Sequence, residues 1–113
     1  MLCSLQAQDT LSLKFDETFI TVGQVTKGEQ ITITYVYQNE SEEPIRITDV
    51  ITTCGCTVPD YPQEPILPDE TGELTVHFDT TKKSGFVRKS VKVLLSSEEN
   101  VQLSFLVNVV EGQ

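Results

Sequence analysis

Apolar and polar residues alternate along most of the chain, and a period of two residues is that of a β-strand with one buried face. The clearest run is residues 30–39, in which Ile31, Ile33, Tyr35 and Tyr37 share one face. Similar but shorter apolar runs occur at residues 11–16, 19–25, 45–50, 74–78, 87–95 and 101–110. No segment repeats apolar residues at helical spacing. The pattern therefore predicts an all-β fold.

Turn residues separate these runs about every eight to twelve positions, which is typical of an antiparallel β-sandwich. We expect an Ig-like antiparallel β-sandwich of about seven strands. The antibody marker of two cysteines and a tryptophan is absent, because the chain has no Trp. In the run 45–50, simple alternation places Asp49 on the same face as Ile45 and Ile47, with Val50 on the opposite face.

Length and charge narrow the class of protein. A chain of 113 residues suits one domain with its own core. The net charge of −9 argues against nucleic acid as a partner, because phosphate recognition depends on clustered Lys and Arg. No apolar run approaches the roughly 18 residues that a membrane-spanning helix needs. Five of the eight basic residues fall between Lys82 and Lys92, where they form either a solvated strand face or a small patch for an acidic partner.

The first eight residues differ from the rest of the chain. They are short, apolar and rich in small side chains, and they resemble the end of a secretory signal with cleavage after Ala7. We therefore expect residues 1–8 to be a signal remnant or a disordered N-terminus, and residues 9–113 to be the single domain. This predicts a periplasmic or otherwise extracytoplasmic protein. The position of Cys3 leaves a lipid anchor open as an alternative.

The most unusual stretch is residues 53–62, which carries Cys54, Gly55 and Cys56 at the end of a predicted strand. Three interpretations are open. The cysteines can be structural, with or without a disulfide; they can form a labile redox pair, since a ring closed over so few residues is strained; or they can grip a soft ion such as Cu(I). A closed zinc site needs four ligands, and the one histidine, His77, is expected to face outward. We therefore predict no resident metal or cofactor.

The residues that follow the cysteines form a candidate partner-contact loop. Proline at four positions from 59 to 68 excludes a helix or a central strand there. The candidate contact residues are Thr57, Pro59, Tyr61 and Pro62. Tyr61 is interpreted first as a loop anchor packed on the core, and second as an aromatic that docks a partner. Because no nucleophile, phosphate loop or acid pair stands out, we predict that the protein is not an enzyme.

Several short motifs, in this order, resemble an uncharacterised family of bacterial extracytoplasmic Ig-like domains with a Cys-Gly-Cys-Thr motif, similar to Hydin-type and major-sperm-protein-type modules. The motifs are Phe19 and residues 23–29, 35–39, 47–50, 53–59, 65–68 and 85–86. They span roughly residues 15–110. The resemblance implies a seven-stranded Ig-like fold, export and an association role. One departure is Asp69, where the family usually has Gly.

The sequence thus predicts a non-enzymatic extracytoplasmic binding or assembly module, with a protein or cell-envelope component as its partner. The surface expected to bind is a sheet edge or the loop around residues 54–62. The alternative function is a thiol-redox or Cu(I)-binding protein that uses Cys54 and Cys56.

Overall fold

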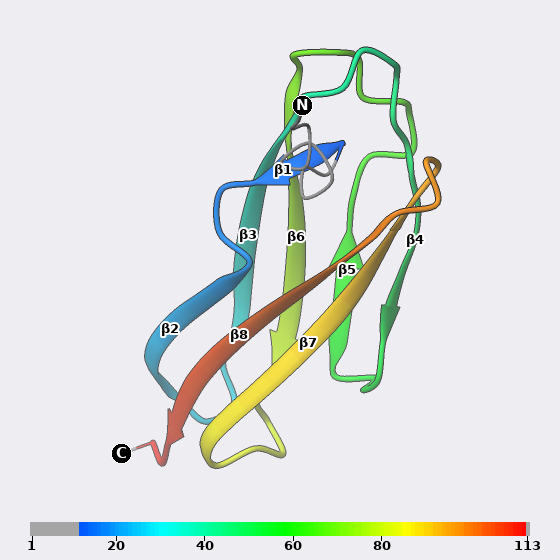
Figure 1. The fold of residues 1–113 in the computed structure, drawn as a ribbon. Helices are drawn as coiled ribbons and strands as arrows, with labels where there is room; N and C mark the ends of the chain where they lie inside the picture. The colour runs from blue at the N-terminus through cyan, green and yellow to red at the C-terminus, as the bar shows by residue number, and fades with distance from the viewer. Residues whose placement is uncertain (1–11, 113) are drawn as a thin grey trace, which may run out of the picture.

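The computed structural model describes residues 12–112, and these form two four-stranded β-sheets packed face to face (Figure 1). No helix occurs within this range. The strands are β1 (Leu13–Phe15), β2 (Phe19–Thr26), β3 (Gln30–Asn39), β4 (Ile47–Thr52), β5 (Thr57–Asp60), β6 (Thr71–Asp79), β7 (Gly85–Leu95) and β8 (Asn100–Val110). The predicted fold class is confirmed. The expected number of about seven strands becomes eight in this range, because the proline-containing stretch after the cysteines adds a short strand, β5, at the edge of the first sheet.

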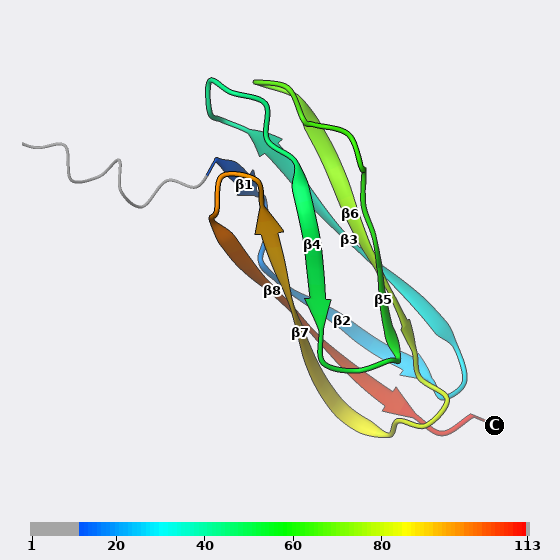
Figure 2. The ribbon, with the colours of Figure 1, turned by 90° about the vertical axis from the view of Figure 1, so that its right-hand side faces the viewer.

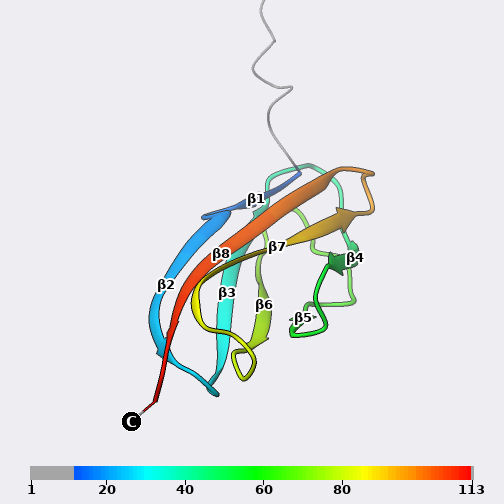
Figure 3. The ribbon, with the colours of Figure 1, turned by 90° about the horizontal axis from the view of Figure 1, so that it is seen from below.

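The first sheet has the order β1-β3-β6-β5 and the second the order β2-β8-β7-β4. All neighbours are antiparallel except β2 and β8, which are parallel. The chain crosses from the first sheet to the second between β1 and β2, so that β2 and β3 lie along one side of the sandwich (Figure 3). Strands β4 and β5 lie along the opposite side (Figure 2).

The core lies between the sheets and consists of the alternating apolar residues. On β3, Ile33, Tyr35 and Tyr37 are buried as the sequence predicts. Phe78 of β6 meets Phe105 of β8 edge to face, with ring centroids 5.2 Å apart, and this contact joins the two sheets. The other large buried side chains are Leu13, Ile47, Leu74, Leu103, Val76, Val93 and Val107.

The predicted face assignment in the run 45–50 is wrong for two residues. Val50 is buried and Asp49 is exposed, the reverse of simple alternation. The cause is a β-bulge between Ile47 and Asp49 in the pairing of β4 with β7, since one extra residue exchanges the two faces beyond it.

The described residues contain no helix long and apolar enough to cross a membrane. The proposed signal remnant, including Cys3 and the cleavage point after Ala7, lies outside the residues that the structure describes.

Candidate functional site

The two cysteines lie in a tight turn between β4 and β5, which carries the chain from the second sheet to the first. The turn is closed by the Thr57 N–H, which donates to the Cys54 carbonyl oxygen at 3.1 Å. Gly55, between the cysteines, is exposed, and a Cβ added there would meet no atom within 4 Å. The turn therefore holds both sulfurs at the end of the sandwich where β4 is joined to β5.

The structure joins Cys54 and Cys56 in a disulfide, with their Cα atoms 5.2 Å apart. The two sulfurs have different neighbours. Cys54 Sγ accepts a hydrogen bond from the Cys56 N–H at 3.2 Å and lies 4.0 Å from Lys83 Nζ. Cys56 Sγ lies 3.8 Å from the Thr57 hydroxyl oxygen. Positive charge and a backbone donor thus converge on one sulfur of the pair.

Cys56 lines two shallow hollows. One is formed with Asp79, Thr81, Lys82 and Lys83, and the other includes Gly55, Val58, His77 and Asp79. A hydrogen bond from the Thr81 hydroxyl, joined by one from its backbone and by the two lysines, lowers the pKa of Asp79. Among residues 12–112, no three His, Cys, Asp or Glu side chains are grouped so as to hold a metal ion. In the disulfide neither sulfur is a thiolate, so Cu(I) would need the reduced pair.

The predicted contact loop divides into buried and accessible residues. Thr57 is buried, whereas Pro59, Tyr61 and Pro62 are half-buried, and Tyr61 packs against the core as a loop anchor. In the pairing of β5 with β6, the Asp79 N–H donates to the Cys56 carbonyl oxygen. Backbone N–H and C=O groups point alternately to the two sides of a strand. Those of Val58 and Asp60 therefore point toward β6, and those of Thr57 and Pro59 point outward.

Strand β5 therefore offers no free outward donor for a partner strand. The Thr57 N–H is already bonded within the turn, and proline has no N–H. This edge lies within the expected contact loop, and it leaves only the outward carbonyl oxygens of Thr57 and Pro59 for a partner strand.

The structure shows an open edge on β3 that the sequence analysis did not locate. Strand β1 pairs only with residues 37–39 of β3, and the last bond on this side runs from the Asp16 N–H to the Val36 carbonyl oxygen. The chain then leaves for the second sheet. Alternation directs the backbone N–H and C=O of Thr34 and Thr32 to the side that β1 has left, and no residue in 12–112 bonds to them.

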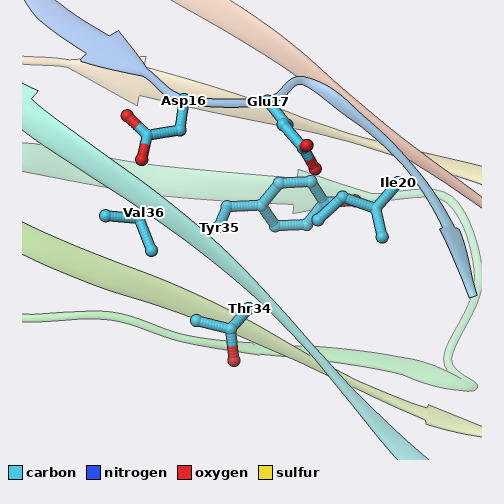
Figure 4. A pocket seen from close by; sticks show the side chains of 6 residues that line it. All are labelled: Asp16, Glu17, Ile20, Thr34, Tyr35 and Val36. Atoms are coloured by element: carbon cyan, nitrogen blue, oxygen red, sulfur yellow. The ribbon is translucent and has the colours of Figure 1, made fainter.

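A pocket of about 210 Å³ lies beside this edge (Figure 4). Its lining combines apolar and acidic side chains: Tyr35 and Val36 with Thr34 on β3, Ile20 on β2, and Asp16 and Glu17 between β1 and β2. The only sequence signal for the open edge is the polar segment 16–18, which interrupts the first apolar runs. That segment does not reveal that the next strand joins the other sheet.

The family comparison matches residues 13–109 to a model described as "Protein of unknown function (DUF1573)". The chain belongs to this family, which confirms the resemblance to an uncharacterised Ig-like family. A search of the curated proteins finds no match.

Solved structures with a similar fold include a PapD-like ASH domain of human CEP192. That domain has a TM-score of 0.75 and 8% identity, and the match covers 90% of this chain and 87% of the domain. A protein of unknown function from Porphyromonas gingivalis W83 has a TM-score of 0.73 and 12% identity over 89% of this chain. The chain spans 50% of that protein's length.

A third similar structure is the YadV chaperone, with a TM-score of 0.62 and 9% identity over 91% of this chain and 55% of the chaperone. At these identities the likeness shows the fold alone. The expectations of export and of a non-enzymatic role therefore stay predictions.

Proposed function

We propose that the protein is a non-enzymatic extracytoplasmic binding or assembly module that adds an extended strand of a protein partner to the open edge of β3. The observation that carries the proposal is the pair of unpaired backbone positions, Thr32 and Thr34, beside an apolar pocket. An added strand would continue the first sheet where β1 stops, and its backbone would bond to both positions. Main-chain bonds then supply affinity, and side-chain pockets supply selectivity.

The pocket favours a particular kind of segment. Alternate side chains of an added strand would point between the sheets, toward Ile20 and the ring of Tyr35 (Figure 4). Asp16 and Glu17 at the rim favour a Lys or Arg near that apolar side chain. A chain with a net charge of −9 also attracts a basic segment at long range.

Export is supported by two independent features. The disulfide between Cys54 and Cys56 is a bond that persists mainly in oxidising compartments. The first eight residues resemble the end of a secretory signal.

The test is a selection from a displayed library of random peptides on the full chain, followed by amide NMR with the selected peptides. We expect apolar peptides with a basic residue, and their binding should protect the Thr32 and Thr34 amides from hydrogen exchange. Thr34→Pro removes the outward N–H of the edge without removing a bond to β6, because Thr34 faces Thr75 in a non-hydrogen-bonded pair. It should weaken binding by about tenfold or more, since each lost bond contributes about 1 kcal/mol and proline also blocks close approach.

Thr34→Ala is the matched control, because it removes the same side chain but keeps the N–H. It should bind within about twofold of the unaltered chain. The proposal is wrong if the library gives no binder, if the bound peptides protect amides elsewhere, or if a folded Thr34→Pro protein binds as well as Thr34→Ala.

A further inference from the structure

The Cys54–Cys56 disulfide has contacts that a structural crosslink does not need. It joins two residues that are only two positions apart in the sequence. A crosslink between such near neighbours constrains the unfolded chain less than one that closes a long loop. The turn is already closed by the bond from the Thr57 N–H to the Cys54 carbonyl oxygen. Both cysteines of the disulfide are only half-buried, so a small thiol can reach it.

Lys83 is positioned beside Cys54 by the turn that follows β6. The Lys83 N–H donates to the carbonyl oxygen of Thr80 at 3.0 Å. The buried Thr80 hydroxyl in turn donates to the Glu29 carbonyl oxygen and accepts from the Gly28 N–H. The backbone of Lys83 is thereby fixed to the neighbouring turn. Its side chain is half-buried, whereas that of Lys82 is exposed.

We propose that Cys54–Cys56 is a thiol–disulfide exchange site, in which a partner's thiolate attacks Cys56 Sγ and Cys54 leaves as the thiolate. The asymmetry of the pair assigns the two roles. Cys56 lines both hollows and is therefore the sulfur that a nucleophile reaches. Cys54 has the Lys83 ammonium at 4.0 Å and the Cys56 N–H at 3.2 Å, two groups that stabilise a negative sulfur. This inference does not depend on strand addition at β3.

The exchange balances with a dithiol as the co-reactant. The first thiolate of the dithiol forms a bond to Cys56 Sγ while the Cys54–Cys56 bond breaks and its electron pair goes to Cys54. The second thiolate of the dithiol then attacks the mixed disulfide at the dithiol's own sulfur and releases Cys56, which takes up a proton. The dithiol is oxidised to a disulfide and the cysteine pair is reduced by two electrons. The reverse sequence oxidises a dithiol partner.

The lysines also bear on which partner reacts. The hollow on one side of Cys56 contains Lys82 and Lys83 together with the Asp79 carboxylate, so two cations that attract a thiolate stand against one anion that repels it. A leaving thiol with a lower pKa leaves faster. Lys83 is therefore expected to accelerate the exchange through Cys54, whereas Lys82 contributes only to the field that attracts the nucleophile.

The test uses the full chain with Cys3→Ser, so that only two thiols are counted, and dithiothreitol as the dithiol probe. We expect the disulfide to be reduced readily, and Lys83→Met to slow the reduction by about threefold to tenfold. Lys82→Met, the matched control, should change the rate by less than about twofold. Alkylation rates against pH should give Cys54 in the Cys56→Ser variant a lower thiol pKa than Cys56 in the Cys54→Ser variant, and Lys83→Met should raise the former.

A second readout locates the attacked sulfur. The disulfide is treated with glutathione, quenched with acid, and the mixed disulfide is mapped by mass spectrometry. The adduct is expected on Cys56. The proposal is overturned if the bond in the folded protein resists dithiothreitol, if the two lysine variants slow reduction equally, if the Cys54 thiol pKa is not lowered by Lys83, or if the adduct lies on Cys54.

Discussion

Tyr35 and Tyr37 lie two positions apart on β3, and both are buried, but their hydroxyl groups have different environments. The Tyr35 hydroxyl donates to the Ser104 carbonyl oxygen at 2.6 Å, which ties β3 to β8 across the core. The Tyr37 hydroxyl has no hydrogen-bond partner among the described residues. A buried polar group without a partner contributes a desolvation cost and no bond.

The two phenylalanine substitutions should therefore differ. We expect Tyr35→Phe to lower the free energy of unfolding by about 1 kcal/mol or more, because it also leaves the Ser104 carbonyl with one bond fewer. Tyr37→Phe should leave it unchanged or raise it slightly. Urea unfolding of the two variants measures the difference, and each is the control for the other, since both delete one oxygen from a buried ring. Equal losses would contradict this account.

At the scale of elements, the turn that precedes β6 gives a physical reason why Gly would suit the position of Asp69. Glu70 N–H donates to the Leu67 carbonyl oxygen, Pro68 is the second residue of the turn, and Asp69 has φ of 70°. These features define a type II turn, whose third residue favours Gly. Gly, the residue that the resemblance implies at this position, suits this backbone better than Asp does.

Asp69→Gly is therefore expected to stabilise the fold by about 0.5–1 kcal/mol, the relief of the left-handed backbone less the entropy that Gly adds to the unfolded chain. Asp69→Ala is the control. It removes the same carboxylate but keeps a Cβ, and it should be less stable than the unaltered chain, because Asp tolerates this region better than Ala. Thermal unfolding ranks the three proteins, and any order other than Gly, Asp, Ala would refute the argument.

The elements differ in how far the sequence predicts them. Strands such as β3 and β8 are long and strictly alternating, so their faces can be read directly. The run 45–50 cannot be read in this way, because the bulge after Ile47 depends on its pairing with β7. The parallel pairing of β2 with β8 is likewise set by the crossing after β1, which alternation does not encode.

The same limit applies to the two candidate sites. The cysteine motif is visible in the sequence, but Lys83 is 29 positions from Cys54, and the fold of the β6–β7 turn brings them together. The open edge of β3 cannot be predicted from residue types. Its backbone groups are unpaired because β1 ends and the chain crosses to the other sheet. In both cases the chemistry lies in contacts between distant segments.

At the scale of the whole molecule, the two buried tyrosines limit stability at high pH. Burial raises the pKa of Tyr35, and burial together with the charge of Glu73 raises the pKa of Tyr37 to about 12. Both groups thus stay protonated in the folded state at a pH where the unfolded chain ionises near its ordinary value of about 10.

The sign of the pH dependence follows from this difference. Above pH 10 the unfolded state binds fewer protons than the folded state, so the free energy of unfolding falls as the pH rises, by up to about 1.4 kcal/mol per pH unit for each such group. Well below pH 10 both tyrosines are protonated in the folded and in the unfolded state, so they do not make the free energy of unfolding depend on pH. We expect urea unfolding between pH 10 and 12 to show a steeper loss for the unaltered chain than for Tyr35→Phe, with the two lines parallel from pH 7 to 9. Because Phe cannot ionise, the comparison removes the contribution of one phenol while the lysines and the carboxylates stay the same. Parallel lines throughout would mean that Tyr35 ionises without unfolding, and that the contact between β3 and β8 opens locally.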